Sequence, residues 1–222
     1  MIDTWNSLDK FNREALQWDE NPQRRAVALG VAQAIIAAVN PSKTMRALEF
    51  GCGTGLVSME IAPLVQTLSA IDTSPEMLAV FQEKISTSGI TNIETSCINL
   101  SASSETSLNE KRFELMYSSM TLHHIDDTAG FLNQLSDLLS PGGIVALADL
   151  DLEDGLFHDD PLEPVHHGFD RAELAALLNG AGLQVTSFET IYTFNKTNRA
   201  GIVAAYPVFL VTATKPQPVT PE

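Results

Sequence analysis

Hydrophobic positions recur along this chain with alternating periods, which predicts a series of strands and helices. A stretch that mixes aromatic and charged residues runs to about Asn21. Apolar residues three and four positions apart then predict a helix that Pro22 opens and that ends at Asn40. Short apolar runs beyond it predict strands, with helical patterns between several of them. The predicted strands cover residues 46–50, 68–71, 93–98, 113–117 and 144–150, and the predicted helices begin near Leu56, Pro75 and Asp127.

The C-terminal part of the chain has a different pattern. Asp170 caps one more helix, with Glu173 as its capping-box partner, and Gly182 follows its end. The runs 185–188 and 207–214 then predict two strands with no helical pattern between them. Strands that alternate with helices form right-handed βαβ units. We therefore predict an α/β fold, a doubly wound Rossmann-like mostly parallel sheet with an antiparallel C-terminal strand pair.

Composition and charge narrow the class of protein. The 222 residues are 44% hydrophobic and 18% charged, which favours one packed domain over 1–222, and no repeat or linker divides it. The net charge of −15 argues against nucleic acid and anionic membrane as partners, because both bind through Lys and Arg. The N-terminus lacks the pattern of a signal peptide, no apolar run could span a bilayer, and two cysteines fit a reducing compartment. We therefore expect a cytoplasmic protein, and the sequence predicts no oligomeric state.

The strongest motif is a glycine loop after the first predicted strand, Glu49-Phe50-Gly51-Cys52-Gly53-Thr54-Gly55. Glycines at alternate positions let the backbone turn sharply and let a ligand approach main-chain N–H groups. The loop is not a dinucleotide fingerprint, which would need a glycine where Leu56 stands, and it lacks the Lys-Ser/Thr pair of a P-loop. A tight turn without a ligand is the structural alternative.

Asp72 ends the second predicted strand, at the distance where a ribose-binding carboxylate follows the glycine loop of nucleoside-binding α/β folds. An aspartate at a strand end is by itself more often a turn or helix cap. Together with the glycine loop, it favours ribose binding.

Several motifs in this order carry a family resemblance. They are Leu48 to Gly55, Asp72, Phe113 to Ser119, and Leu139 to Gly143. Over about residues 18–215 the chain resembles the class I S-adenosylmethionine-dependent methyltransferases. It is most similar to the small-molecule group that includes the ubiquinone and menaquinone types, through Thr121-Leu122-His123-His124 and Gly168-Phe169-Asp170.

The resemblance implies S-adenosylmethionine as the cofactor. It implies that Glu49 orients the loop and reaches the methionine amine, and that Asp72 holds the ribose. Asn99 stands where the family often has an aspartate facing adenine, and its amide oxygen can still accept that hydrogen bond. The other implied cofactor residues are Gly51, Cys52, Gly53, Gly55, Thr73, Met77, Leu100, Ser118, Met120 and His123.

The same resemblance narrows the chemical class of the methyl acceptor. Ser118-Ser119-Met120-Thr121 differs from the Asn/Asp-Pro-Pro-aromatic signature of amino methyltransferases, and Asp149-Leu150 does not match the metal-dependent catechol type. The family likeness thus implies metal-independent transfer to a small molecule. The alternatives are a catalytically silent S-adenosylmethionine-binding protein with a regulatory role, and a protein or RNA methyltransferase.

Histidine is the natural general base near neutral pH, and the chain has five. We expect His123, His158 and His167 as catalytic candidates; packing beside the cofactor is the alternative for His123. The resemblance places the substrate pocket at the connection 151–169 and beneath the N-terminal segment 1–40. Acids near His158 could supply metal ligands, but their spacing matches no known site, so we predict no metal. The expected substrate residues are Trp18, Phe157, His158, His166 and His167.

The acidity is also uneven along the chain. No lysine or arginine lies between Arg112 and Arg171, an interval that is rich in Asp and Glu and covers the expected substrate side. An acidic rim there favours a neutral or cationic acceptor over an anionic one. A solvated surface that never meets the substrate is the alternative.

Overall fold

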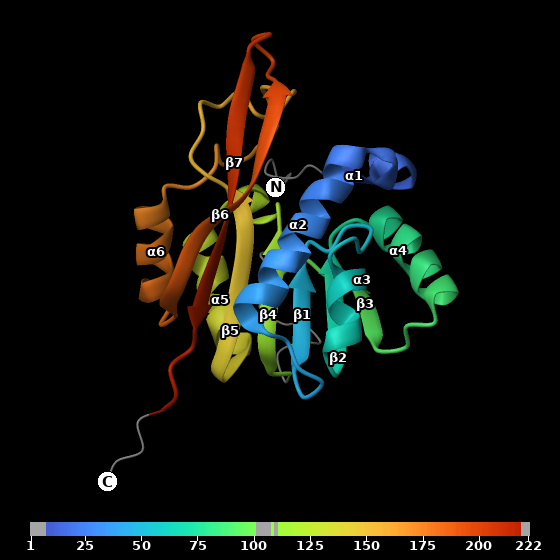
Figure 1. Ribbon diagram of the computed structural model, residues 1–222, viewed down its shortest axis with the longest axis vertical. Coiled ribbons are helices and arrows are strands. Elements are labelled where there is room, and N and C mark those ends of the chain that lie inside the picture. The colour runs from blue at the N-terminus through green and yellow to red at the C-terminus, as the bar shows by residue number, and fades with distance from the viewer. Residues whose placement is uncertain (1–7, 101–107, 109–110, 219–222) are drawn as a thin grey trace, which may run out of the picture.

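A seven-stranded sheet forms the centre of the molecule in the computed structural model, which describes residues 8–100, 108 and 111–218 (Figure 1). The strand order is β3-β2-β1-β4-β5-β7-β6. Strands β1 to β5 are parallel, and β7 runs antiparallel to both β5 and β6. The predicted α/β fold with an antiparallel C-terminal pair is confirmed. The strands are β1 (Arg46–Phe50), β2 (Thr67–Asp72), β3 (Ile93–Cys97), β4 (Phe113–Ser119), β5 (Leu139–Leu150), β6 (Gln184–Thr197) and β7 (Val203–Thr214).

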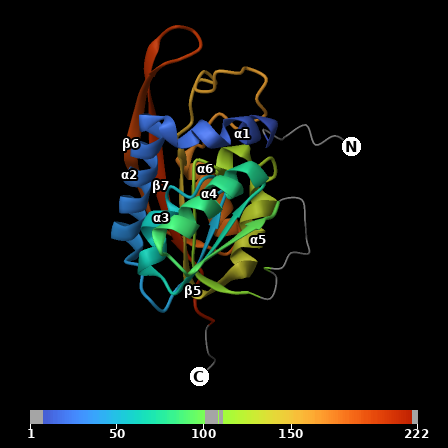
Figure 2. The same cartoon turned by 90° about the vertical axis from the view of Figure 1, so that its right-hand side faces the viewer.

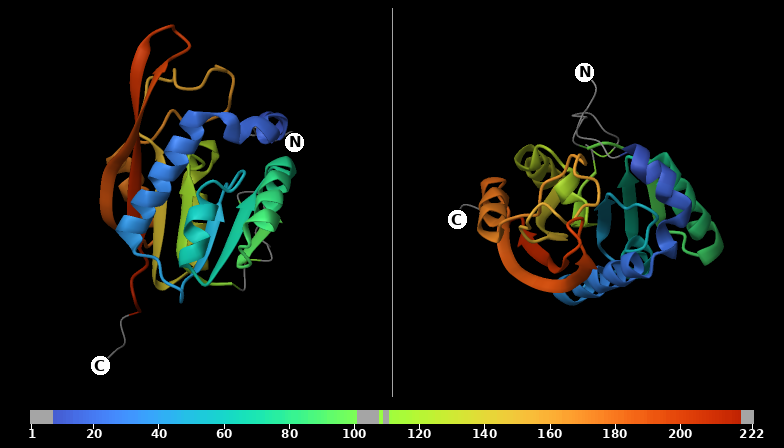
Figure 3. Two further views of the ribbon diagram at one scale, coloured as in Figure 1. Left: turned by 45° about the vertical axis from the view of Figure 1, so that its right-hand side comes forward. Right: turned by 90° about the horizontal axis from the view of Figure 1, so that it is seen from above.

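Helices cover both faces of this sheet (Figure 3). One face carries α2 (Pro22–Val39), α3 (Ser58–Ile61) and α4 (Pro75–Ser88), and the other carries α5 (Thr128–Leu138) and α6 (Arg171–Gly180). Four short elements complete the described chain: α1 (Leu8–Glu14) and the 3-10 turns η1 (Ala15–Glu20), η2 (Ala62–Leu64) and η3 (Leu122–His124). None of the helices in the described part of the chain has both the length and the apolar character needed to cross a bilayer.

Side-chain caps fix where the helices begin, as their sequences predict. The Asn21 side chain accepts hydrogen bonds from two backbone N–H groups of the first turn of α2, and the Ser74 side chain accepts one from the Met77 amide of α4. The Asp170 carboxylate accepts from the Ala172 and Glu173 amides in the first turn of α6. Each cap satisfies donors that a helix N-terminus would otherwise leave unpaired.

Alternate residues of each strand supply two apolar layers. In β1, Leu48 and Phe50 face the layer of α5 and α6, whereas Ala47 faces the layer of α2 and α3. Phe50 meets Phe131 of α5 edge to face, with ring centroids 4.9 Å apart. This two-sided burial explains why the parallel strands read as nearly continuous apolar runs.

Four elements differ most from the sequence prediction in their boundaries. The helix after the glycine loop is a single turn, α3, followed by η2, whose first turn contains Pro63. Strand β5 begins at Leu139 and not at residue 144, because Leu139 pairs with Phe113 across a register shift and Gly142 donates to the Lys215 carbonyl. Strands β6 and β7 are much longer than 185–188 and 207–214, and they form a hairpin that projects beyond the sheet (Figure 1).

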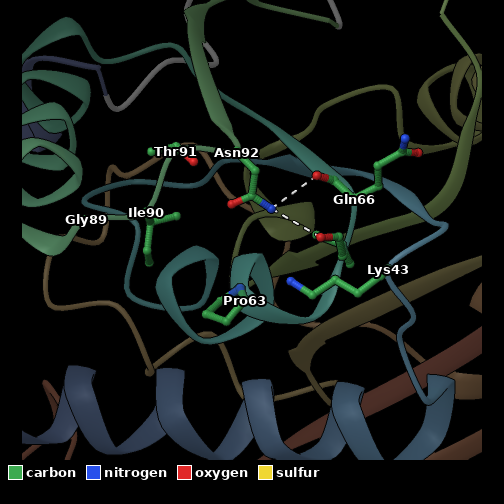
Figure 4. Close-up of a pocket in the computed structure, with 8 residues that line it drawn as sticks. Lys43, Pro63, Gln66, Gly89, Ile90, Thr91 and Asn92 are labelled. Atoms are coloured by element: carbon green, nitrogen blue, oxygen red, sulfur yellow. Dashed lines mark hydrogen bonds between the residues drawn. The ribbon is translucent and has the colours of Figure 1, made fainter.

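A shallow hollow lies at the amino ends of β2 and β3 (Figure 4). Its central polar group is the Asn92 side-chain amide, which donates to the carbonyls of Ala62, Val65 and Gln66 at 2.9, 3.2 and 3.3 Å. These bonds tie the turn after η2 to the start of β3. The hollow is therefore explained by the structure of this turn.

Glu114 forms an ion pair at the same end of the sheet, and its removal has an expected effect on stability. Hydrogen bonds from Arg46 outweigh burial and lower the pKa of Glu114 from 4.5 to about 2. A depressed folded-state pKa stabilises the protein above the ordinary pKa, and this contribution is lost as the pH falls to about 2. We expect Glu114→Gln to lower the free energy of unfolding at pH 7 by about 1 kcal/mol, since the pair is partly solvent-screened.

Urea unfolding at pH 7 and at low pH measures this effect. The difference between wild type and Glu114→Gln should shrink between pH 4.5 and about 2. Glu94→Gln, which removes the exposed partner of Lys111, is the matched control and should change little. A Glu114→Gln difference that stays constant with pH would contradict the assignment.

Candidate functional site

A cavity of about 630 Å³ opens at the carboxyl ends of the parallel strands. Figure 2 shows α1 and the connection 151–169 at this same end of the sheet. The carboxyl edge of an open α/β sheet is where such folds bind ligands. The cavity walls come from the glycine loop, from the ends of β2 and β4, from α1 and η1, and from the connection.

The glycine loop needs glycine for steric as well as conformational reasons. Gly51 and Gly55 have φ of +63° and +79°, a backbone region that favours glycine. A Cβ on Gly51 would overlap the Thr121 side chain, and one on Gly55 would overlap the Phe81 ring. Gly53 also has positive φ, but the space around its Cβ position is open. The loop is therefore held tightly at both ends and leaves room at its centre.

Asp72 connects this loop to the next helix. Its Oδ2 accepts from the Gly53 N–H at 2.7 Å, and its Oδ1 accepts from the Ser74 N–H at 2.8 Å. Burial raises the pKa of Asp72, and the backbone hydrogen bonds oppose that rise. Each carboxylate oxygen can accept a further hydrogen bond. Asp72 thus faces the cavity as a fixed acceptor.

Glu49 lies behind the loop at the end of β1. It is 2% exposed, and it accepts a hydrogen bond from the Ser58 hydroxyl. Burial raises the pKa of Glu49 to about 8, against the opposing effect of hydrogen bonding. Glu49 also lines the cavity, where a cationic ligand group would favour its charged form.

We call α1 and η1, residues 8–20, the N-terminal cover. Its Asp19 carboxylate accepts from the Thr54 hydroxyl of the glycine loop at 2.6 Å and forms an ion pair with Lys84. Its Asn12 accepts from the Ser74 hydroxyl at 2.7 Å. The cover is therefore bonded to both turns that border Asp72.

Three histidine rings gather at the other end of the cavity. The ring centroids are 4.1 Å apart for His123 and His124, 5.1 Å for His123 and His158, and 5.9 Å for His124 and His158. Burial, together with the two neighbouring imidazoles, lowers the pKa of His124 well below its usual range. His124 is therefore neutral near pH 7.

Two of these histidines are paired with carboxylates. His123 Nδ1 lies 2.7 Å from Asp149, a fully buried side chain that also accepts from the His123 and Leu150 amides. His158 Nδ1 lies 3.3 Å from Glu163. His158 Nε2 and His124 Nδ1 are buried and have no hydrogen-bond partner among the residues that the structure describes.

The backbone is strained at the same end of the cavity. Met120, directly after β4, has φ of +56°, and its N–H donates to the Ala148 carbonyl. A non-glycine residue in this region costs about 1–3 kcal/mol and is held by its surroundings.

Within the described ranges, no group of three His, Cys, Asp or Glu side chains is arranged to hold a metal ion.

The structure brings most of the sequence-predicted site residues together. The residues of this set that line the cavity are Trp18, Glu49, Gly51, Cys52, Gly53, Asp72, Thr73, Met77, Asn99, Leu100, Met120, His123, Phe157 and His158. Gly55, Ser118, His166 and His167 are not in the lining. Gly55 lies against Phe81 beneath the loop, and Ser118 is fully buried in β4.

His166 and His167 follow the cavity-lining part of the connection. The His166 ring contacts the Ile125 carbonyl at 2.9 Å, and His167 is exposed and lies beside Gly155. Neither ring faces the cavity, because the backbone here pairs with His123 and Glu153 and directs the two side chains elsewhere. His167 as a catalytic residue therefore has no geometric support.

Sequence reasoning missed residues that reach the cavity from distant segments. They are Lys10 and Phe11 of α1, Glu163 of the connection, and Phe194 and Lys196 of β6. Lys10 binds both Glu163 oxygens, at 2.9 and 2.7 Å, across 153 residues of sequence. Glu163 is one of many acids in its interval, so the sequence does not single it out, and no local signal points to Lys10.

Several carboxylates in the interval without lysine or arginine, between Arg112 and Arg171, pair with cations from outside that interval. Its pairs are Glu114–Arg46, Asp151–Arg171, Asp159–Lys196 and Glu163–Lys10. Among the described residues that line the cavity, six carboxylates still accompany three Lys or Arg side chains. The acidic character of the rim is thus weaker than the sequence suggests, but it persists.

Comparisons with known proteins agree with this geometry. A family profile described as "Methyltransferase domain" matches residues 4–188. The ubiquinone biosynthesis O-methyltransferase of Xanthomonas axonopodis pv. citri is 29% identical over 232 residues, 95% of this chain and 94% of that protein. An uncharacterized methyltransferase of Schizosaccharomyces pombe is 32% identical over 152 residues, 63% of this chain but only 53% of the yeast protein.

The fold also matches solved structures. The N-methyltransferase NodS from Bradyrhizobium japonicum, solved in complex with S-adenosyl-L-homocysteine, superposes with a TM-score of 0.68 at 16% identity, over 97% of this chain and 100% of that one. The family profile covers the glycine loop, Asp72 and the histidine cluster. The chain therefore belongs to the family of methyltransferase domains, and the resemblance to S-adenosylmethionine-dependent methyltransferases that its motifs indicate is confirmed.

Proposed function

We propose that this chain binds S-adenosylmethionine in the cavity and transfers its methyl group to a small-molecule nucleophile without a metal. The observation that carries the proposal is the placement of Asp72. Its carboxylate is fixed by the Gly53 and Ser74 amides at one end of a cavity whose other end holds the histidine cluster. A nucleoside anchor and a set of proton acceptors thus share one enclosed space.

The residues present fit the donor. Asp72 offers free lone pairs for the ribose hydroxyls, and Asn99 offers an amide oxygen for the adenine amino group. Glu49 is buried at the glycine loop, where an ammonium would pair with its charged form. The donor supplies a methyl group already activated on a sulfonium, so the chain has to align the acceptor and, where needed, remove its proton.

His158 is the general base in this proposal. Its Nε2 is buried without a partner in the described chain, and the ring lines the cavity. A hydroxyl or amine of the acceptor would give its proton to this nitrogen while its lone pair bonds to the methyl carbon, and the methyl–sulfur bond would break to leave a neutral thioether. His123, fixed by Asp149, supports the same end of the cavity. This chemistry needs no Lewis acid.

The acceptor class follows from the cavity lining. Even without Glu49, whose pKa burial raises to about 8, five carboxylates accompany three cations among the described lining residues, which favours a neutral or cationic acceptor. Aromatic side chains of the wall, including Phe11, Trp18, Phe157 and Phe194, suit a small, largely apolar molecule. The net charge of −15 supports an enzyme that binds neither nucleic acid nor anionic membrane.

The donor site is tested by replacing Asp72. We expect Asp72→Ala to raise the dissociation constant for S-adenosylmethionine roughly 10- to 100-fold, because a buried charged hydrogen-bond acceptor is lost. Isothermal titration calorimetry measures it. Asp170→Ala is the matched control, since Asp170 also accepts from two backbone amides but caps α6 and does not line the cavity.

Unchanged donor affinity in Asp72→Ala would refute the ribose assignment. A screen of wild-type protein with labelled donor and small hydroxyl, amine and thiol compounds tests transfer itself. Donor binding with no product from any of them would support the silent binding protein, and product formed only on RNA or protein would support the other alternative.

A further inference from the structure

Lys10, Glu163 and His158 form a chain of contacts that the general-base assignment does not by itself require. Glu163 lies between the two bases, with Oε2 2.7 Å from Lys10 Nζ and 3.3 Å from His158 Nδ1. Its side chain is 3% exposed, whereas those of Lys10 and His158 are 36% and 11% exposed. A buried carboxylate is thus held by two partners from different segments, α1 and the connection.

The charge state of Glu163 determines which ring nitrogen of His158 carries the hydrogen. Burial alone would raise the pKa of Glu163, but the hydrogen bonds from His158 and Lys10 outweigh it and hold the pKa well below its usual range. An ionised carboxylate only accepts hydrogen bonds. His158 Nδ1 must therefore carry the hydrogen, so that whenever the ring is neutral Nε2 carries the lone pair.

We propose that Glu163 and Lys10 are positioning residues for the base, with Glu163 fixing the Nδ1–H tautomer of His158 and Lys10 keeping Glu163 in place. This inference rests on the proposed function. Neither residue touches the acceptor in this scheme. Their effect is to keep Nε2 without a hydrogen where the acceptor would bind. They are needed because the neutral imidazole of an unconstrained histidine favours the opposite tautomer.

The pair of Glu163 and His158 differs in its surroundings from the pair of Asp149 and His123. Asp149 fixes His123 from within the sheet, where it is fully buried and bonded to two backbone amides. Glu163 has its lysine partner on the N-terminal cover, which is also bonded to the turns around Asp72. The cover thus contacts both the donor side and the residue that orients the base.

Nitrogen-15 NMR of the histidine rings tests the proposal without acceptor or turnover. The His158 signals are assigned by their loss in His158→Gln. We expect wild type to show the Nδ1–H form, and Glu163→Leu, which removes the acceptor, and Lys10→Met to lose that signal in favour of Nε2–H. Lys10→Arg should retain it. Lys111→Met, which removes a lysine from an exposed pair with Glu94, should also retain it.

Kinetics supply the second measurement. Glu163→Leu should lower kcat roughly 10-fold or more, as loss of a carboxylate behind a functional histidine does, while the donor dissociation constant stays unchanged. Persistence of the Nδ1–H form in both Glu163→Leu and Lys10→Met would overturn the proposal. If Glu163→Leu fails to fold, the more exposed Lys10→Met decides alone. Because the tautomer is observed without substrate, failure here is distinct from failure of donor binding or methyl transfer.

Discussion

Replacing His158 with glutamine is expected to lower kcat by about 100- to 10,000-fold, the range that general acid–base catalysis contributes. Glutamine has a similar reach and can accept a hydrogen bond, but it cannot take a proton at neutral pH. The ring nitrogen that it replaces, Nε2, is buried at the cavity wall without a partner in the described chain. Single-turnover measurements with bound donor would report the loss directly.

The donor dissociation constant should stay within about twofold in this variant, since Asp72 ends β2 and the His158 ring lies beside His123, beyond the end of β4 with β1 between, and a change below about 0.4 kcal/mol is expected. His167→Gln is the informative companion, because His167 comes from the same connection but is exposed and outside the lining. Its turnover should match wild type. Equal losses in the two variants, or none in His158→Gln, would contradict the assignment.

Gly55→Ala is expected to lower the free energy of unfolding by about 2–5 kcal/mol. Roughly 1–2 kcal/mol comes from the positive φ of +79°. A further 1–3 kcal/mol comes from overlap with the buried Phe81 ring, which the surrounding core prevents from moving. Denaturant unfolding with donor titration would show the loss of stability and a weakened donor site together.

Gly89→Ala separates the two causes. Gly89 ends α4 with φ of +73°, yet nothing lies within 4 Å of the position that its Cβ would occupy. This variant should lose only the conformational part, about 1–2 kcal/mol. If Gly55→Ala were no worse than Gly89→Ala, the contact with Phe81 would not constrain the loop.

Much of the fold is encoded locally, and those parts were predictable. Pro22 and Ser74-Pro75 start helices wherever the chain continues in a helical pattern, and the apolar run around Leu48 forms a strand in a sheet covered on both sides. The boundaries that went wrong depend on pairing partners. Strand β5 extends back to Leu139 only because Phe113 lies beside it.

The candidate site likewise has parts that local sequence predicts and parts that depend on distant segments. The glycine loop and Asp72 are neighbours across one βαβ unit, so their spacing in sequence reports their contact in space. The substrate side is assembled from segments far apart in the chain. The sequence alone gives no reason to prefer His158 over His167 as a cavity residue. The path of the connection places the His158 ring in the cavity wall and leaves His167 exposed. Lys10 gains its role from a partner 153 positions away.

Ion pairs attach the connection 151–169 to its surroundings, together with the packed rings of Phe157 and Phe169. Asp151, Asp159 and Glu163 pair with Arg171, Lys196 and Lys10 respectively, while Leu152 and Leu162 are 65% and 86% exposed. The sheet, by contrast, is held by buried apolar side chains. Ionic strength screens partly exposed ion pairs and leaves apolar burial intact. High salt should therefore weaken the two partly exposed pairs of the connection, Asp151–Arg171 and Asp159–Lys196, more than the apolar core of the sheet.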